Sequence, residues 1–253
     1  MLTIGGLSVS FGVVPVLRDV SFECGKGQVT AVIGPNGAGK TTLFDALTGF
    51  VAAREGSVVC DEKQVSGLAP YRVARSGISR TFQTPRLFDR MTVLENLKVA
   101  HEDGGLLRLT LSAFARRSEA GHDRASADKA TGILEFLRLD HVRHQLAADL
   151  SGGQRKLVEL GRALMTDPQY VLLDEPVAGV APALVGEIGV RLRELAERGL
   201  GVVLIEHNMD FVMKTSDYVV VIANGAILTR GTADEVRADP RVLEVYLGGA
   251  TQP

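Results

Sequence analysis

The sequence GPNGAGKT, which runs from Gly34 to Thr41, decides the fold that we expect for this chain. It matches GxxxxGK[ST], the phosphate-binding pattern called the P-loop. Its glycines let the backbone wrap closely around phosphate oxygens, so that backbone N–H groups can donate to them. The apolar run Val29–Ile33 precedes the pattern, and a helical pattern that begins at Gly39 follows it. Strand, glycine-rich turn and helix are the order that this motif requires.

Two side chains of this loop are expected to bind the charged groups of the ligand, one the phosphates and the other the metal ion. Lys40 can reach the β- and γ-phosphates of a nucleotide, where the following helix also directs the positive end of its dipole. Thr41 supplies a hydroxyl ligand for Mg²⁺. The loop residues that we expect to bind the nucleotide are Gly34, Pro35, Asn36, Gly37, Ala38, Gly39, Lys40, Thr41 and Thr42.

A second anchor is the run YVLLDE, from Tyr170 to Glu175, in which an apolar strand ends in two carboxylates. Asp174 at the carboxyl end of a buried strand can hold Mg²⁺ beside the P-loop, as a Walker B aspartate does. Because side chains alternate along a strand, we expect Glu175 to point elsewhere. A carboxylate in that place can orient and polarise an attacking water, so Glu175 is the predicted general base.

Composition limits the classes of protein to which the chain can belong. It has 253 residues, of which 45% are hydrophobic, and a formal net charge of −2. The chain is too apolar to be disordered, and its charge gives no reason to expect nucleic-acid binding. No apolar run approaches the roughly 18 residues of a membrane span, and the N-terminus lacks a signal-peptide pattern. Cys24 and Cys60 form no CxxC pair, so we expect a soluble protein of the reducing cytoplasm.

Apolar runs alternate with helical patterns after residue 167. Tyr170–Leu173, Gly201–Ile205 and Tyr218–Ile222 are typical of strands in a parallel sheet that is covered on both faces. The stretch 89–166 has a helical pattern and is predicted to be an inserted subdomain. Within it, the polar run Arg116–Lys129 is expected to be a solvated loop or an exposed helix face. Near the N-terminus, short strands are expected over Leu2–Phe11, Val16–Phe22, Gln28–Ile33 and Ser57–Cys60.

The sequence LSGGQ at Leu150–Gln154 narrows the class of phosphate-binding protein. Ser151 can cap the helix that runs to about Met165, and the two glycines leave its first amides open to an anion. The string reproduces the signature of the ATP-binding cassette (ABC) ATPases. It also lies 23 residues before Asp174, as that family arranges it.

Three further residues follow the order of the ABC family. Gln83 comes after the strand-like run Ile78–Phe82 and resembles the Q-loop glutamine. His207 comes after an apolar strand and resembles the switch histidine, whereas a histidine in that place would otherwise be an ordinary loop residue. Phe11 stands where the family has an aromatic that stacks on adenine. The resemblance therefore covers nearly the whole chain.

The resemblance implies an α/β fold of the P-loop NTPase (RecA-like) class. Its core would be a mostly parallel sheet, accompanied by an antiparallel β subdomain and an inserted α-helical subdomain. The chain would form a single ABC ATPase domain over residues 1–253. Its nucleotide-binding core would comprise 1–88 and 167–253, and its helical signature subdomain 89–166.

The resemblance also assigns roles to particular residues, with ATP and Mg²⁺ as cofactors. The metal ligands would be Thr41, Gln83 and Asp174. The catalytic residues would be Glu175, His207, Gln83 and Lys40. The signature residues that close on the γ-phosphate held by a partner's P-loop would be Ser151, Gly152, Gly153 and Gln154. Hydrolysis would therefore require a head-to-tail pair of ATPases.

One position departs from the family pattern. The loop after the Walker B strand usually ends in aspartate, whereas Val177–Ala181 ends in alanine. This removes a polar group from the expected dimer interface, and coupling between the two ATP sites could be weaker or asymmetric. His141 and His144 have loose metal-ligand spacing, but because no carboxylate or cysteine cluster accompanies them we interpret them as surface residues.

A finer resemblance rests on the strings RTFQ at 80–83, RLF at 86–88, MTVLENL at 91–97 and IEHNM at 205–209, and on the long insert after Val99–Ala100. These strings and the C-terminal segment look like the ATPase subunits of bacterial importers for branched-chain and other hydrophobic amino acids. The implied partners are two membrane permeases, a second ATPase and, indirectly, an extracytoplasmic solute-binding protein. The ATPase pair is expected to be heteromeric, with a homodimer as the alternative.

The expected location is cytoplasmic and peripheral, on the inner face of the cell membrane. The ATPase of a urea or amide importer, or of a lipid or lipopolysaccharide exporter, would have the same catalytic parts. An ABC protein of translation or DNA repair is disfavoured, because the chain has one motif set, no heptad array and no basic surface charge.

Overall fold

A computed structural model describes residues 1–101 and 116–248 of the chain. Two compact units are present. One comprises Met1–Gln83 and the described part of Pro168–Pro253, and the other is the described part of Thr84–Asp167. The sequence had led us to expect the inserted subdomain at 89–166. Residues 102–115 of that stretch, which include part of the expected insert after Ala100, lie outside the described residues.

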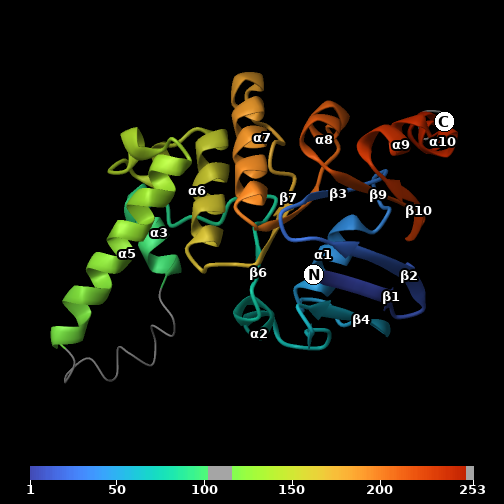
Figure 1. Ribbon diagram of the computed structural model, residues 1–253, viewed down its shortest axis with the longest axis horizontal. Coiled ribbons are helices and arrows are strands. Elements are labelled where there is room, and N and C mark those ends of the chain that lie inside the picture. Colours follow the sequence, from blue (N-terminus) through green and yellow to red (C-terminus); the bar gives the residue numbers. More distant parts are fainter. Residues whose placement is uncertain (102–115, 249–253) are drawn as a thin grey trace. The chain divides into compact units, whose positions relative to one another are not determined.

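The first unit is built on a six-stranded sheet whose order is β10-β9-β3-β8-β7-β6 (Figure 1). Strands β6, β7, β8, β3 and β9 run parallel, and β10 pairs antiparallel with β9. The strands are β3 (Val29–Ile33), β6 (Ile78–Arg80), β7 (Tyr170–Asp174), β8 (Gly201–Ile205), β9 (Tyr218–Ala223) and β10 (Ala226–Gly231). Every residue of β3, β7 and β8 is buried, which explains why these segments of the sequence are almost entirely apolar.

Helices of the same unit follow or flank these strands. They are α1 (Lys40–Leu47), α2 (Pro70–Arg75), α7 (Pro182–Glu197), α8 (Met209–Thr215), α9 (Ala233–Ala238) and α10 (Pro240–Gly248). Figure 1 shows α7, α8 and α9 on one side of the sheet and α1 on the other. In the described part of the chain, no helix is both long and apolar enough to cross a membrane.

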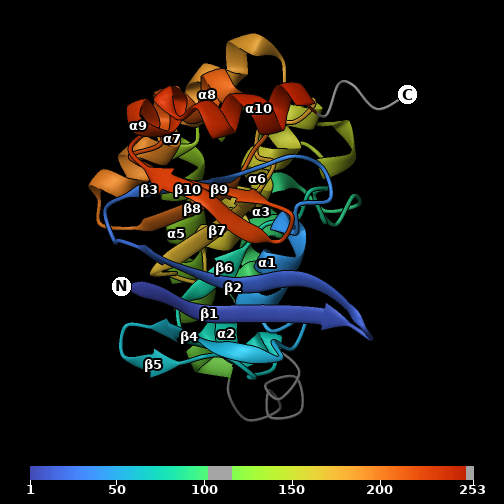
Figure 2. The same cartoon turned by 90° about the vertical axis from the view of Figure 1, so that its right-hand side faces the viewer.

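A smaller antiparallel sheet has the strand order β2-β1-β4-β5 (Figure 2). Its strands are β1 (Leu2–Phe11), β2 (Val14–Cys24), β4 (Glu55–Cys60) and β5 (Lys63–Gln64). The alternation of buried residues in β1 shifts by one residue between Ile4 and Leu7, where the pairing with β2 has a bulge. Gly6 has a φ of +62°, a conformation that glycine adopts without strain. The bulge keeps both halves of the strand facing the core.

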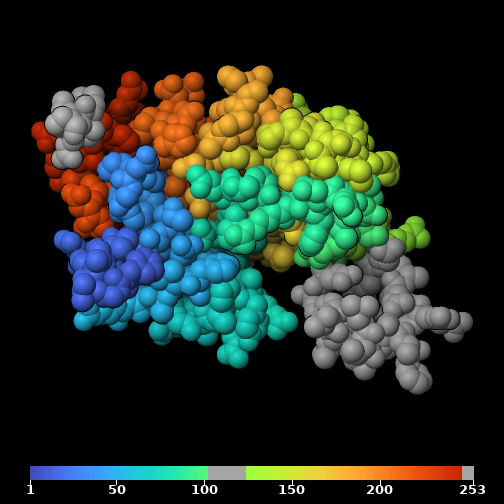
Figure 3. Space-filling model, turned by 180° about the vertical axis from the view of Figure 1, so that it is seen from behind, coloured from blue at the N-terminus to red at the C-terminus, as the bar shows by residue number. Residues whose placement is uncertain are grey.

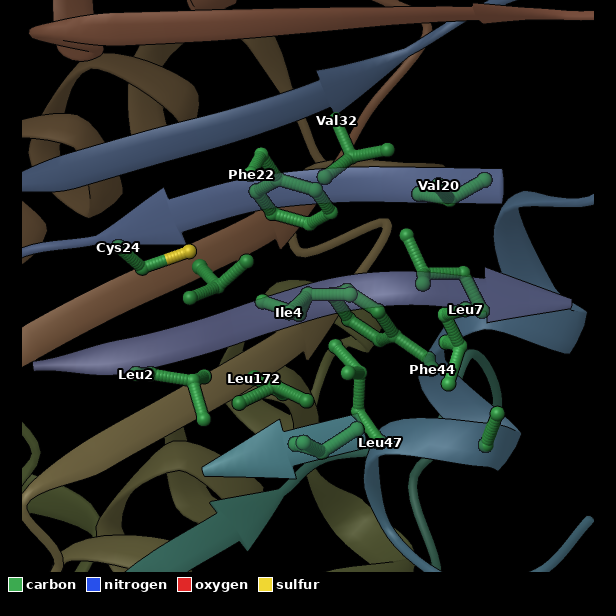
Figure 4. Packing of buried hydrophobic residues seen from close by; sticks show 14 of the residues in the cluster. Leu2, Ile4, Leu7, Val20, Phe22, Cys24, Val32, Phe44, Leu47 and Leu172 are labelled. Carbon is green, nitrogen blue, oxygen red and sulfur yellow. The ribbon is translucent and has the colours of Figure 1, made fainter. Parts of the chain in front are cut away.

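The core of this unit lies where the antiparallel sheet, α1 and the parallel sheet meet. Figure 4 shows side chains of β1 and β2 close to Phe44 and Leu47 of α1 and to Leu172 of β7, all of them buried. The N-terminal strands thereby hold α1, the helix that follows the P-loop, against the parallel sheet. In the space-filling view of Figure 3, the dark blue N-terminal residues of this unit border the lighter blue segment that follows them in the sequence.

The second unit is helical in the residues described. Its elements are α3 (Val93–Ala100), α5 (Arg116–Phe136), η2 (Asp140–Val142), η3 (Ala147–Asp149) and α6 (Gly152–Leu164). The polar run Arg116–Lys129 belongs to α5 and is helical, one of the two structures that its composition allowed. Asn96 is buried in α3, and its amide group bonds to the backbone of Phe88, Met91 and Thr92, so it fixes the loop that precedes the helix.

Candidate functional site

All the sequence-predicted site residues of the first unit except Phe11 lie on or next to the carboxyl ends of the parallel strands. The P-loop follows β3, Asp174 ends β7, His207 lies two residues beyond β8, and Gln83 lies three residues beyond β6. These strands are neighbours in the order β3-β8-β7-β6, and all of them run in the same direction. Their carboxyl ends therefore meet at the same edge, which is where open α/β sheets bind ligands.

The P-loop owes its path to glycines in conformations that other residues avoid. Gly34, Gly37 and Gly39 have φ angles of +154°, +79° and +99°. A Cβ atom on Gly34 would lie 2.0 Å from the carbonyl oxygen of Ile222, which leaves no room for a side chain. Gly39 caps α1 without a side-chain hydrogen bond. The loop thus passes close to β9 and turns directly into the helix.

Lys40 lies folded over the loop that it follows. Its Nζ atom donates to the carbonyl oxygens of Gly34, at 2.8 Å, and of Pro35, at 2.9 Å. Burial lowers the pKa of Lys40, and the negative charges of Glu175 and Asp174 oppose that shift. Thr41, the next residue, is exposed. The ammonium group of Lys40 and the exposed residue Thr41, which carries a hydroxyl, therefore lie next to each other at the start of α1.

Asp174 is buried at the end of β7 and pairs with Arg80 at the end of the adjacent strand. Arg80 Nη2 lies 3.1 Å from Asp174 Oδ2, and Arg80 Nη1 lies 2.5 Å from Asp45 Oδ1 of α1. The guanidinium also lies near two aromatic rings, 5.6 Å from the centroid of Phe44 and 5.4 Å from that of Phe82. Burial raises the pKa of Asp174, whereas the hydrogen bond and the charge of Arg80 lower it.

Two predicted catalytic side chains, Gln83 and His207, lie beside a third, Glu175. Gln83 Nε2 donates to Glu175 Oε2 at 3.0 Å, and His207 Nδ1 lies 3.6 Å from Glu175 Oε1. The reason we gave for the direction of Glu175 was wrong, because the residue does not continue the strand. Its φ is +50°, so the chain turns through a left-handed conformation immediately after Asp174. This turn, rather than strand alternation, sets where the carboxylate points.

The signature segment lies in the helical unit and forms the cap that its sequence predicts. Ser151 Oγ accepts the N–H of Gln154 at 3.3 Å, and the Gln154 side chain accepts the N–H of Ser151 at 2.9 Å. This reciprocal pair begins α6, which ends at Leu164. Ser151 and Gly152 are both exposed, so this helix N-terminus is open to a charged ligand.

The remaining predicted residues have simple surroundings. Phe11 ends β1 and is 54% exposed, so its ring can stack on a planar ligand. Ala181 occupies the position before α7, where it provides no side-chain hydrogen bond to the helix. An aspartate there could cap the helix, which is a second consequence of the alanine. His141 and His144 are exposed, as expected of surface residues.

Two buried charged residues at this edge had no role in the sequence analysis. Arg80 joins Asp45 to Asp174, and Glu206, which follows β8, accepts backbone N–H groups from two loops. Glu206 directly follows the apolar strand β8, and Arg80 is the last residue of the short strand β6. A charged residue in that position is the sequence signal that could have marked them as part of the site.

The family model described as "ABC transporter" matches residues 17–178, and the model described as "Branched-chain amino acid ATP-binding cassette transporter" matches residues 226–251. Together these two matches cover the P-loop, the signature segment, the Walker B strand and the C-terminal helices.

The relatives span nearly the full length of the chain. A probable branched-chain amino acid transport ATP-binding protein LivG of Methanocaldococcus jannaschii is 42% identical over 242 residues, which are 94% of this chain and 93% of the relative. The high-affinity branched-chain amino acid transport ATP-binding protein BraF of Pseudomonas aeruginosa is 37% identical over 251 residues, covering 99% and 98%.

Solved structures agree with the fold. A nucleotide-free ATP-binding cassette from an ABC transporter gives a TM-score of 0.84 at 40% identity, covering 97% of this chain and 98% of that chain. The ADP conformation of an ATP-binding cassette of an ABC transporter gives 0.84 at 40% identity and covers 98% of both chains. The predicted P-loop fold class, with its parallel and antiparallel sheets, is confirmed.

Proposed function

We propose a function for this chain from its family: it belongs to the ABC transporter family. Its function would be to hydrolyse ATP and so to drive the import of branched-chain amino acids. The observation that supports the hydrolytic part best is the meeting of Gln83, Glu175 and His207 at the sheet edge that also carries the P-loop. A carboxylate that is held in place by neighbouring side chains can act as a general base when it lies within hydrogen-bond reach of the attacking water.

The phosphates would be held by the P-loop and Lys40. In the described structure, the ammonium group of Lys40 is satisfied by two loop carbonyl oxygens. Phosphate oxygens are stronger acceptors because they carry charge, so the lysine would exchange those carbonyls for them. Phe11 would stack on the adenine ring from the end of β1, and Thr42 would line the phosphate site with the loop residues.

Oxygen donors at the same edge fit Mg²⁺. The hydroxyl of Thr41 is exposed, Asp174 is a buried carboxylate, and the amide of Gln83 is exposed, and Mg²⁺ binds such oxygen ligands. When bound, the ion would neutralise charge on the β- and γ-phosphates. The carboxylate of Asp174 would then interact with both Mg²⁺ and Arg80, which already donates a hydrogen bond to it.

Glu175 would accept the proton of the attacking water. His207 and Gln83 lie on either side of its carboxylate and would fix the direction of that carboxylate and the position of the water. Phosphoryl transfer is catalysed mainly by positioning and charge neutralisation, so small displacements of these three side chains would reduce the rate.

ABC ATPases generally work as dimers together with membrane permeases. We propose that the signature residues Ser151–Gln154 act on the γ-phosphate bound by a partner's P-loop in a head-to-tail pair. Ser151 and Gly152, at the N-terminus of α6, are exposed and therefore accessible to such a phosphate. The partner is proposed to be a second, related ATPase, with a second copy of this chain as the alternative.

The assembly would sit on the cytoplasmic face of the cell membrane, with two permeases and, indirectly, an extracytoplasmic solute-binding protein. The segment Phe82–Phe88, which contains Gln83, is proposed to contact a permease and to relay the state of the nucleotide. No role with nucleic acid is proposed, because the net charge is −2.

The substrate class is supported by the names of the relatives and by the C-terminal family match at 226–251. A urea or amide importer and a lipid or lipopolysaccharide exporter remain the alternatives. To distinguish them, the chain would be purified with its permeases and second ATPase and reconstituted into proteoliposomes. ATP-dependent accumulation of leucine that requires the binding protein is expected. Transport of urea but not leucine, or outward movement of lipid, would contradict the proposal.

A further inference from the structure

Glu206 follows β8 and is completely buried, yet both of its carboxylate oxygens are occupied by backbone N–H groups. Oε1 accepts the N–H of Val177 at 3.0 Å. Oε2 accepts the N–H of His207 at 3.0 Å and that of Asn208 at 3.2 Å. One side chain therefore joins two loops that are about thirty residues apart in the sequence.

These two loops carry the proposed base and the proposed switch histidine. Val177 is two residues after Glu175, and His207 is the residue next to Glu206 itself. Glu175 has a left-handed φ of +50°, which is unfavourable for a residue with a side chain. Such a conformation persists only where its surroundings hold it.

The chain around Glu175 is held on both sides by the end of β8. Before the turn, the N–H of Glu175 donates to the carbonyl oxygen of Ile205 at 3.0 Å. After the turn, the N–H of Val177 donates to Glu206. The unusual conformation is therefore fixed by two consecutive residues of the adjacent strand end, and the second of these also fixes the backbone of His207.

We propose that Glu206 is a positioning residue, which holds Glu175 and His207 at their working separation by tying the two loops together. The proposal rests on the proposed ATP hydrolysis by this chain. Glu206 is not placed against the reacting atoms. Its carboxylate acts through the backbone N–H groups of the two loops, and its Oε2 atom also lies 3.9 Å from Nδ1 of the His207 ring.

The chemistry of the contact requires a carboxylate. A glutamine of the same size has one acceptor oxygen, and its NH₂ group would face an N–H donor on the other side. Glu206→Gln would therefore leave the N–H of Val177, or those of His207 and Asn208, without an acceptor in a buried place. Glu206→Asp keeps the charge but is one methylene shorter, so it would not span both loops.

A matched control lies at the opposite end of the same sheet. Asp217 precedes β9, and its Oδ2 atom accepts the N–H of Val29 at 2.8 Å, where β3 begins. Asp217→Asn makes the same change from carboxylate to amide at a backbone N–H. It lies away from the carboxyl ends of the strands, so it leaves the candidate site intact.

The test measures ATPase kinetics and hydrogen exchange on the intact transporter complex. Glu206→Gln and Glu206→Asp are expected to lower kcat by about 10-fold to 100-fold, the cost of a misplaced catalytic group. The dissociation constant for ATP should stay within about twofold, because the P-loop sets it. Amide exchange should accelerate in peptides covering 175–180 and 206–210, and neither change should occur in Asp217→Asn.

Unchanged exchange in these peptides, or a kcat equal to that of the wild type, would overturn the role of Glu206. A parallel loss of ATP affinity and kcat would also overturn it, because that pattern indicates general damage. Failure of the proposed function is distinguishable, since the wild-type complex would then show no ATP hydrolysis at all.

Discussion

Arg80 Nη2 lies 3.1 Å from Asp174 Oδ2, and both side chains are more than nine-tenths buried. The two residues end adjacent parallel strands, and Asp174 is the proposed metal ligand. Arg80 also donates to Asp45 of α1, the helix that begins at the P-loop lysine. A single guanidinium therefore connects the P-loop helix to the Walker B strand.

Replacing Arg80 by methionine should destabilise the protein strongly. Asp174 would keep its buried charge without a partner, and such a change typically costs about 3 to 5 kcal/mol. Urea unfolding of Arg80→Met would measure this loss. The control Arg193→Met removes an exposed cation that lies 3.8 Å from Asp217, and it should cost less than about 1 kcal/mol.

The pH dependence gives the same pair a second test. Burial raises the pKa of Asp174 and Arg80 lowers it, so the pKa should rise further in Arg80→Met. Because a protonated Asp174 has no charge to leave unpaired, the stability difference from the wild type should shrink as the pH falls. A difference that is constant with pH would contradict the ion pair.

Glu175→Gln should bind ATP but hydrolyse it at least about 100-fold more slowly, because the glutamine amide cannot accept a proton. Phosphate release would give the rate, and equilibrium dialysis the affinity for ATP. Glu187→Gln, an exposed change on α7, serves as control. Turnover close to the wild-type rate in Glu175→Gln would remove this carboxylate from the mechanism.

A mixing experiment tests whether Ser151 acts on a partner's nucleotide. Lys40→Ala and Ser151→Arg subunits should each be inactive alone. A pair that contains one of each has one site with an intact P-loop and an intact signature, so ATPase activity should recover. No recovery in any mixture, including mixtures with the second ATPase of the transporter, would indicate that both groups act within one chain.

Alkaline pH should destabilise the first unit. Burial raises the pKa of Cys24 to about 12 from 9.0, and burial also raises the pKa values of Cys60 and Tyr170. The folded protein therefore keeps protons that the unfolded chain loses, so the free energy of unfolding should fall as the pH rises above about 9.

Cys24→Ala isolates the largest of these thiol effects. Above pH 9 the variant should lose stability less steeply than the wild type, by up to about 1.4 kcal/mol per pH unit, the value for one titrating group. Urea unfolding at several pH values between 8 and 11 would provide both slopes. Equal slopes would mean that the Cys24 thiol ionises as easily in the folded protein as in the unfolded chain.

Local sequence was sufficient to predict those strands and helices whose pattern lies within a few adjacent residues. Unbroken apolar runs predicted the buried strands β3, β7 and β8, and Ser151 predicted the start of α6. Ends of elements were less accurate: β2 extends over Val14–Cys24 rather than Val16–Phe22, and β6 ends at Arg80 rather than Phe82. Hydrogen bonding to a neighbouring strand decides where a strand ends, and a single segment does not contain that information.

The sequence by itself determined the P-loop pattern and which residues follow each strand, because glycine, lysine and apolar periodicity act locally. The tertiary structure decided which of those residues meet. Sheet order places β8 beside β7, so that Glu206 reaches Val177, and it places β6 on the other side of β7, so that Arg80 reaches Asp174. The left-handed turn at Glu175 likewise depends on bonds to Ile205 and Glu206, which come from another strand and are absent until the sheet has formed.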